Sequence, residues 1–427
     1  MEMQQLIAVL KNQVTPALGC TEPGAVALAV ARAKELLGEP VRRLEVSVDK
    51  NILKNGMDVG IPGTSERGIV FAAALALVVG RSEYSLEVLR DVTAADIPKA
   101  LELVAQKIIT LQLDEQADGL TIRVRAFGDS TNSHVLIRNA HTNIVFEARG
   151  EEVLIDEVPP TTPTDKPAPK PEIKNAIKDY TIDQLIDFCD SVPLAQIAFI
   201  QDGVDMNRKI GNIGISEALG IGMGRFLCTQ ASRPADRAKA LTAAASEARM
   251  AGWPLPVMSS AGSGNHGLVA ILPISVIGEG LGIPNERILR AVTLSHLVTI
   301  YVKVYIGALS PVCGCGVAAG VGCAAGLVYL QGGGHQQVKS AINNMIAGIS
   351  GMICDGAKLG CSYKLSIAVD AAVDAAGMAL QGLEIPSDNG ILGATAEQTI
   401  QNLARISNVG MNNTDNIILD VMLRKCL

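Results

Sequence analysis

The stretch that decides the fold runs from Val304 to Gly334 and reads VYIGALSPVCGCGVAAGVGCAAGLVYLQGGG. It carries no charged residue, and by length alone it could span a bilayer. Pro311 and the glycines on both sides of it interrupt the stretch, however, and it ends in three glycines rather than in a basic or aromatic anchor. We therefore predict two buried helical pieces, at about 284–308 and 316–330, joined by a functional turn.

The composition of the 427-residue chain agrees with closely packed helices. Only 3% of the residues are aromatic and 42 are glycine, yet the apolar classes reach 48%, so Ala, Val, Ile and Leu must fill the core. The charged share is 19% and the net charge is -7, which lacks the basic footprint of a general nucleic-acid binder. Because the first residues show no secretory signal, we expect a cytoplasmic protein without a membrane or nucleic-acid partner.

A proline-rich segment divides the chain. Residues 159–171 read PPTTPTDKPAPKP, which is the composition of an extended, solvated linker. The length of the chain also favours two domains over one. We predict an α+β domain over 1–158, a linker over 159–175 and a helical domain over 176–427.

The two predicted domains differ in their patterns. Before the linker, helices are expected at about 3–13, 23–37, 65–80 and 96–106. Alternating apolar residues predict strands near 44–48, 120–126, 135–138, 143–148 and 153–155, and the short spacing of the last three indicates an antiparallel sheet. After the linker almost everything reads as helix with Gly-rich breaks, so that domain is expected to be all-α.

Five of the nine cysteines fall between residues 313 and 361. One interpretation is that free cysteine, a small hydrophobe, suits a core rich in Ala and Gly. Against it, Cys315 lies in a Gly-rich turn, while Cys354 and Cys361 flank a second loop, and small neighbours let several sulfurs reach one centre. Soft thiolates select zinc or an iron–sulfur cluster. A structural zinc site usually has paired knuckles, whereas three cysteines from two loops suit a [4Fe-4S] cluster whose fourth iron stays open.

Cys20 is the one cysteine before the predicted linker. It directly precedes Thr21-Glu22-Pro23 and an apolar run, a pattern typical of a helix N-terminus. The partial positive charge at that end is expected to lower the pKa of the thiol and to favour the thiolate. The alternative is an ordinary helix cap preceded by a buried cysteine.

Three motifs carry a resemblance to a known family: LGCTEP at 18–23, SAGSGNHG at 260–267, and the two cysteine loops. With them the sequence resembles, over nearly its whole length, the iron–sulfur L-cysteine desulfidases, whose C-terminal half is similar to the α-chain of the oxygen-sensitive iron–sulfur L-serine dehydratases. Cys315 and Cys323 match a Cys-x(7)-Cys spacing of that α-chain, and Cys354 with Asp355 opens its second loop. Gly356 departs from the pattern, which has a proline there, and the loop is shorter.

The resemblance implies a [4Fe-4S] cluster held by Cys315, Cys354 and Cys361, with Cys313 open as a substitute for Cys315. It also implies that Cys20 is the base that removes the α-proton of the substrate. The expected enzyme is a lyase that converts L-cysteine to pyruvate, ammonia and hydrogen sulfide, with an iron–sulfur L-serine dehydratase as the alternative.

Candidate substrate-binding residues come from two segments. The turn at 259–267 offers hydroxyls, including that of Ser263, and backbone N–H groups that could form an anion nest. The resemblance places Asn265 and His266 at the substrate. A loop at 51–56, after the first strand, could bring Lys54 and Asn55 toward the cleft between the domains. The expected partner is a small amino acid, and the sequence leaves a homo-oligomer open.

Other functions stay open from the residues alone. A non-enzymatic cluster or zinc protein, such as a redox sensor, would use the same cysteines, whereas a membrane transporter is opposed by the broken apolar runs. Pyridoxal phosphate would need a Schiff-base lysine and a phosphate cradle, and no segment clearly offers both. Cys426, the penultimate residue, is either a tail thiol without a role or a temporary ligand of the open iron.

Overall fold

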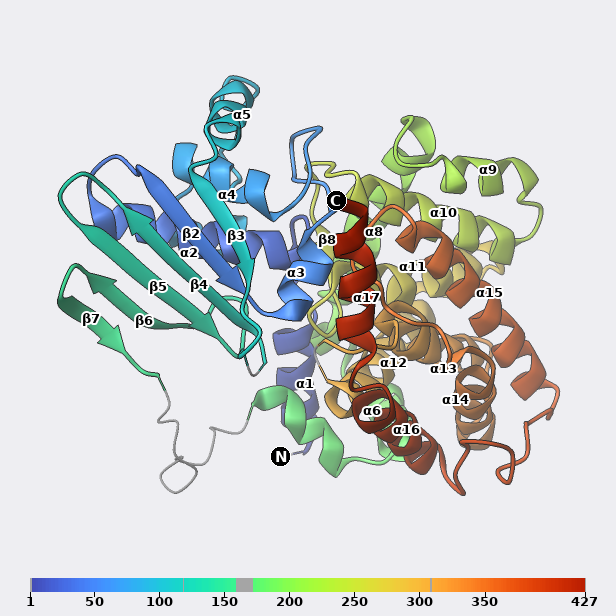
Figure 1. Cartoon of the computed structure of the whole chain (residues 1–427). Coiled ribbons are helices and arrows are strands. Elements are labelled where there is room, and N and C mark those ends of the chain that lie inside the picture. The colour runs from blue at the N-terminus through green and yellow to red at the C-terminus, as the bar shows by residue number, and fades with distance from the viewer. Residues whose placement is uncertain (1, 118, 159–171, 308, 427) are drawn as a thin grey trace, which may run out of the picture.

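The computed structural model describes residues 2–117, 119–158, 172–307 and 309–426. Figure 1 shows a twisted sheet backed by helices and, beside it, a larger body made almost wholly of helices. This arrangement confirms an α+β N-terminal part followed by a mostly helical C-terminal part. The predicted linker at 159–171 lies outside the described residues.

Helices and strands are mixed in the first part. Its elements are α1 (Glu2–Gln13), β1 (Pro16–Ala17), α2 (Thr21–Leu37), β2 (Arg43–Val48), α3 (Lys50–Gly56), α4 (Ile69–Val78), η1 (Ser82–Glu87), α5 (Ile97–Ala105), β3 (Ile109–Leu113), β4 (Thr121–Phe127), β5 (Asn132–Arg138), β6 (Ile144–Arg149) and β7 (Glu152–Asp156). The segment at 51–56, predicted as a loop, belongs to helix α3. Asp49 caps this helix by accepting hydrogen bonds from the backbone N–H groups of Asn51 and Ile52.

The sheet has the strand order β3-β2-β4-β5-β6-β7. From β2 through β4, β5 and β6 to β7 the pairs are antiparallel, as expected, but β3 runs parallel to β2, with Leu44 opposite Ile109. The prediction of an antiparallel sheet was therefore wrong at this edge. The physical reason is that α3, α4 and α5 cross over between the two strands and return the chain to the same end of the sheet.

Helix α2 forms the centre of the first hydrophobic core. It packs against β4 and β5, and its alanines at 25, 27, 29, 31 and 33 are fully buried. Because alanine has a small side chain, the helix can approach both the sheet and α4 closely. This packing fixes the start of α2, where Cys20 is the capping residue.

Helices dominate the second part. Its elements are η2 (Ile173–Asp179), α6 (Ile182–Ser191), α7 (Leu194–Ile197), α8 (Ile200–Ser216), α9 (Met223–Gln230), α10 (Pro234–Met250), β8 (Val257–Met258), α11 (Gly264–Gly280), α12 (Asn285–Ile306), η3 (Cys315–Gly320), α13 (Val321–Leu330), α14 (His335–Ile349), α15 (Cys361–Leu380), α16 (Ala396–Arg405), η4 (Ile406–Gly410), α17 (Thr414–Leu423) and η5 (Arg424–Cys426).

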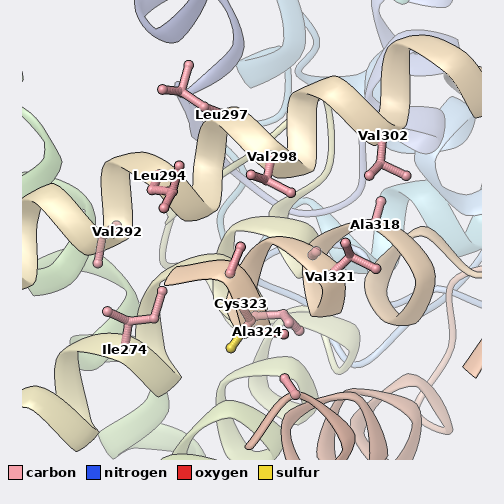
Figure 2. Packing of buried hydrophobic residues seen from close by; sticks show 14 of the residues in the cluster. Ile274, Val292, Leu294, Leu297, Val298, Val302, Ala318, Val321, Cys323 and Ala324 are labelled. Carbon is pink, nitrogen blue, oxygen red and sulfur yellow. The ribbon is translucent and has the colours of Figure 1, made fainter. Parts of the chain in front are cut away.

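The uncharged stretch folds into two helical pieces joined by a turn, as predicted. Helix α12 ends at Ile306, Gly307 follows with a φ of 89°, and the π-helical turn η3 continues into α13. Figure 2 shows Val298 and Val302 of α12 packed against the η3–α13 segment. Among the described residues α12 is the one helix long and apolar enough to cross a membrane, yet 83% of its most apolar window is buried inside the protein. It is therefore a core helix.

Packing joins the two parts at both ends of the chain. Helix α1 places Leu6 and Leu10 in the core of the helical part. Conversely, α17 returns beside α3 near the sheet, as Figure 1 shows, and Leu419 belongs to the core around α2. The division of the chain into two domains at the linker thus remains a prediction from the sequence. Hydrophobic contacts of α1 and α17 extend across this predicted boundary.

Candidate functional site

A cavity of about 450 Å³ lies where the two parts meet. Residues from both parts line it, and they include all of the candidates that the sequence put forward. These are Cys20, Lys54, Asn55, Ser263, Asn265, His266, Cys313, Cys315, Cys354 and Cys361. The fold thus brings together residues that are more than 300 positions apart, and their individual roles remain predictions.

A short two-stranded pairing carries Cys20 to the cavity. Strand β1 pairs with β8, and beyond the pair the backbone N–H of Ser259 donates to the carbonyl of Thr15 over 2.9 Å. The backbone N–H of Ala261 likewise donates to the carbonyl of Gln13 over 3.1 Å. The segment leading to Cys20 is therefore attached directly to the Ser-rich turn of the helical part.

Cys20 lies at the N-terminus of α2, as the sequence predicted, but its acidity differs from the expectation. Burial raises the pKa of the thiol to about 11, while the charge of Arg249 and a hydrogen bond from it act in the opposite direction. The expected lowering by the helix N-terminus is thus corrected: loss of water costs the thiolate more than the helix end returns.

Backbone hydrogen bonds hold the two cysteine loops side by side. The N–H of Cys313 donates to the carbonyl of Met352 and the N–H of Cys354 donates to the carbonyl of Pro311, each over 2.7 Å. Between them Val312 and Ile353 form an antiparallel bridge. This short ladder places cysteines from both loops on one wall of the cavity.

Gly356, the position that departs from the family pattern, has a structural reason. Its φ is 95°, which proline cannot adopt. A Cβ atom there would lie 2.3 Å from the carbonyl oxygen of Lys54, so the cysteine loop packs directly against helix α3. Glycine at this position allows the two parts of the chain to meet at the cavity.

The cysteine thiols influence one another's acidity. A hydrogen bond from Cys315 lowers the pKa of Cys313 to about 6, while the pKa of Cys315 is raised well above its usual range. Burial raises the pKa of Cys361 to about 12 and also raises that of Cys354. Among the thiols of this wall, the thiolate is therefore favoured first at Cys313.

Two lysines face these thiols. Burial lowers the pKa of Lys303 to about 8, although Cys354, Cys315 and Cys313 favour its charged form. Lys364 donates to the carbonyl of Ile353 over 3.0 Å and pairs with Asp355 at the start of the second loop. The wall thus provides positive charge that can compensate bound thiolates.

The donor set fits an iron–sulfur cluster in its chemistry. Soft sulfur ligands from two loops lie on one wall, next to cationic side chains. Within the part of the chain that is described, no three His, Cys, Asp or Glu side chains converge as ligands of a single ion would. A cluster distributes its cysteines over separate irons, so Cys315, Cys354 and Cys361, or Cys313 in place of Cys315, are the residues that would hold it.

The remaining cysteines lie elsewhere. Cys189 and Cys323 are fully buried in the helical core, and neither lines the cavity. Figure 2 shows Cys323 within this apolar packing. Cys228 is exposed. The Cys426 side chain falls outside the described residues, so its two interpretations stay open.

The Ser-rich turn presents the start of α11 to the cavity. Ala261 and Gly262 both have positive φ values, and Ser263 is the residue before the first turn of the helix. In that turn the Nδ1–H of His266 donates to the carbonyl of Ser260 over 3.2 Å, which leaves Nε2 as an acceptor. Burial lowers the pKa of His266 to about 3, so the ring is neutral at physiological pH. Gly314 makes room for it, since a Cβ there would lie 2.4 Å from Nε2.

Lys54 and Asn55 reach the cavity from α3. The Lys54 ammonium forms an ion pair with Asp415 of α17 over 2.5 Å and donates to the carbonyl of Cys354 over 3.1 Å. Asn55 donates to the carboxylate of Glu22 over 3.0 Å. Lys54 therefore links three segments around the site, and Asn55 supports the segment that carries Cys20.

Sequence reasoning missed three buried charged residues on the cavity wall: Glu22, Arg249 and Lys303. The sequence does hold a signal for two of them, because Arg249 ends a run rich in alanine and Lys303 is the one charge in the apolar sequence from 293 to 306. A lone charge in an otherwise apolar helix suggests a specific partner.

Four helical starts meet at this cavity. Cys20 precedes α2, Ser263 precedes α11, Cys315 begins η3 and Cys361 begins α15. Helix N-termini carry partial positive charge and unpaired N–H groups, and both favour anions. The arrangement therefore suits thiolates and a substrate carboxylate better than it suits a cationic ligand.

Comparisons with known proteins show the family of the chain. The serine dehydratase alpha chain family model matches residues 83–420. The chain is 57% identical over 420 residues to a UPF0597 protein of Caldanaerobacter subterraneus subsp. tengcongensis, covering 98% of each protein. It is 55% identical over 422 residues to a UPF0597 protein of Clostridium tetani, covering 99% of this chain and 98% of the relative. The chain therefore belongs to the serine dehydratase alpha chain family.

Proposed function

We propose that the protein is a lyase that eliminates the β-substituent of a small L-amino acid, with L-cysteine as substrate and pyruvate, ammonia and hydrogen sulfide as products. One observation carries the proposal: Cys20 and the four cysteines of the two loops line the same cavity. Membership of the serine dehydratase alpha chain family supports the class of reaction.

The cofactor of this reaction would be a [4Fe-4S] cluster held by Cys315, Cys354 and Cys361. When bound, a cluster with an open iron supplies a Lewis acid that makes the β-substituent a better leaving group. The start of η3 and of α15, together with Lys303 and Lys364, would compensate the charge of the thiolates that hold it.

The base in the proposal is Cys20. Its thiolate takes the proton from Cα, the Cα electron pair forms the Cα–Cβ double bond, and the Cβ–S electron pair leaves with sulfide. The aminoacrylate that remains takes up water to give pyruvate and ammonia. Because burial raises the pKa of Cys20 to about 11, the thiolate is scarce at neutral pH, and Arg249 is the group that favours it.

Neutral polar groups on the same cavity would orient the substrate. The Nδ1–H of His266 donates to the carbonyl of Ser260, and Nε2 can accept a hydrogen bond from the substrate. Ser263 and Asn265 add a hydroxyl and an amide at the start of α11.

The alternative is an L-serine dehydratase with the same machinery, in which hydroxide leaves instead of sulfide. The family name favours it. Nothing in the thiol wall or in the base distinguishes sulfur from oxygen at Cβ, so the two activities need a direct comparison.

The test is anaerobic purification, iron and acid-labile sulfide analysis, and a pyruvate assay on L-cysteine and L-serine. We expect a brown protein that contains iron and forms pyruvate, with a higher kcat/KM for L-cysteine. A higher value for L-serine would select the dehydratase. An iron-containing protein that forms pyruvate from neither amino acid would favour the redox sensor, and full activity without iron would refute the cluster.

A further inference from the structure

Two opposite charges are buried in the cavity without ion-pair partners. Arg249 is 5% exposed and Glu22 is 8% exposed, and both line the cavity. Among the ion pairs of the described residues, neither side chain appears. Buried charges are usually paired, because an isolated one loses its hydration without compensation. Both therefore point to a ligand that carries the complementary charges.

Arg249 is held firmly but is only partly satisfied. At the C-terminal end of α10 it donates to the carbonyl of Gly19 over 2.7 Å and to Oδ1 of Asn265 over 3.2 Å. Its Nε lies close to Gly264, where a Cβ would come within 2.4 Å, so the glycine makes room for the guanidinium. A guanidinium has five N–H groups; the bonds to these two oxygens use two of them, and the hydrogen bond to the Cys20 thiol uses a third. The remainder can bind a carboxylate.

Glu22 is held in a similar way from the other part of the chain. In the first turn of α2, its Oε1 accepts from Asn55 over 3.0 Å and its Oε2 accepts from the hydroxyl of Thr21 over 3.2 Å. Each carboxylate oxygen has a second lone pair. The carboxylate is therefore positioned, still has acceptor capacity, and lies two residues from Cys20.

We infer that Arg249 binds the carboxylate and Glu22 binds the ammonium group of a free α-amino acid, beside the thiol of Cys20. The inference rests on the proposed function and names its recognition residues. A zwitterion compensates both buried charges at once, whereas a hydroxy acid or a simple amine compensates one. Lys303, the other buried cation on the wall, faces the cysteines of the two loops and belongs to the thiol wall.

This assignment orients the substrate. With both α-substituents bound at Arg249 and Glu22, the Cα–H lies near Cys20 and the Cβ-substituent is left for the cysteine wall. A peptide is excluded as substrate, because none of its residues carries both a free ammonium group and a free carboxylate on the same Cα.

The experiment is calorimetric titration of the anaerobically purified full-length protein with three matched probes. L-Alanine carries both charges and no leaving group, propionate lacks the ammonium group, and ethylamine lacks the carboxylate. The variants are Arg249→Met, Arg249→Lys and Glu22→Gln. Arg208→Met and Glu279→Gln are the controls, since these residues pair with each other away from the cavity.

We expect each charge-removing variant to weaken L-alanine binding by about tenfold or more, as the loss of hydrogen bonds to a charged group does. The binding of propionate should weaken only in Arg249→Met, and the binding of ethylamine only in Glu22→Gln. Arg249→Lys should recover part of the propionate affinity, and the two controls should match the wild type.

Unchanged L-alanine binding in both variants, or equal loss of all three probes in each, would overturn the inference. If a variant does not fold, the wild-type protein alone tests the inference. Propionate or ethylamine binding to it as tightly as L-alanine would also overturn the inference. If the three probes bind as expected but no pyruvate forms, the recognition residues are supported and the lyase activity is refuted. Pyruvate formation without the pattern would refute only the recognition residues.

Discussion

The two walls of the cavity are built in different ways. On the wall formed by the start of α2 and the end of α3, side chains hold one another: Asn55 donates to Glu22, and Lys54 pairs with Asp415. On the cysteine wall, backbone hydrogen bonds such as that from Cys313 to Met352 hold the loops. In our proposal the first wall serves proton transfer and, through Glu22, substrate recognition, whereas the second wall binds the cofactor.

The thiols of the two walls also differ in their pKa values. Cys20 is a single sulfur whose pKa is raised to about 11 by burial and moderated by Arg249. Cys313 belongs to a group, and the hydrogen bond from Cys315 lowers its pKa to about 6. A base takes up a proton and releases it again in each turnover, whereas a ligand has to remain a thiolate. On the cysteine wall the lowered pKa favours the thiolate at Cys313, while the pKa values of Cys315, Cys354 and Cys361 are raised.

The largest expected effect is on the cysteine wall. Replacing Cys315, Cys354 or Cys361 by alanine should remove the iron and abolish pyruvate formation, since a lost ligand costs more than a lost supporting contact. Iron content, the visible spectrum and the pyruvate assay measure it. Cys323→Ala is the control, because that thiol lies in the core and away from the cavity. If the Cys315 variant keeps its iron while Cys313→Ala loses it, the ligand is Cys313 in place of Cys315.

A slightly smaller effect is expected on the other wall. Cys20→Ala should lower kcat by about a hundredfold to ten-thousandfold, as the loss of a general base does, while iron content stays at the wild-type level. Measuring kcat and iron content on the same variant distinguishes a lost base from a lost ligand. Activity that survives the substitution would remove Cys20 as the base, and iron loss would place Cys20 among the ligands.

The pH dependence should follow Cys20. Its raised pKa of about 11 keeps the thiol protonated at neutral pH, so activity should increase as pH rises. Below the pKa the thiolate fraction grows about tenfold per pH unit, which sets the slope of kcat/KM between about pH 7 and about pH 9. Arg249→Met should move the profile further to alkaline pH, because Arg249 favours the thiolate. A rate that is flat or falls over this range would contradict the assignment.

The smallest effect concerns the contact between the walls. Gly356→Ala should destabilise the fold by about 1–3 kcal/mol, because alanine would have to adopt a φ of 95° and approach the Lys54 carbonyl. Thermal unfolding of the wild type and the variant measures this. Gly360→Ala in the same loop is the matched control, since its nearest neighbour would be a flexible lysine carbon 3.9 Å away. Equal melting temperatures for the two variants would show that the loop adjusts without cost.

Much of the local structure could be predicted from the sequence. The helix at 97–105, the place of Cys20 at the start of a helix and the broken helix pair at 285–330 follow from periodicity, residues typical of helix ends and glycines, which act over a few neighbours. Strand β3 was not among the predicted strands, and its parallel pairing with β2 was not predicted either, because strand direction depends on the crossover between the two strands.

The candidate site could be predicted as a set of residues but not as an environment. Cys20, Asn265 and the cysteine loops carry recognisable local patterns. Glu22, Arg249 and Lys303 were missed, because a charged residue in a helix is ordinarily a solvated one and only burial makes it unusual. The direction of the Cys20 pKa was predicted wrongly for the same reason, since desolvation is a property of the packed cavity.

The sequence by itself determined most of the helical and strand segments, the break in the uncharged stretch and the grouping of the cysteines, because each depends on residues close together in the chain. Only the tertiary structure decided that Cys20 faces the cysteine loops, that α1 and α17 pack across the predicted boundary, and that two opposite charges are buried without an ion-pair partner among the described residues. These properties depend on contacts between distant segments and on the exclusion of water, and both arise only when the chain is folded.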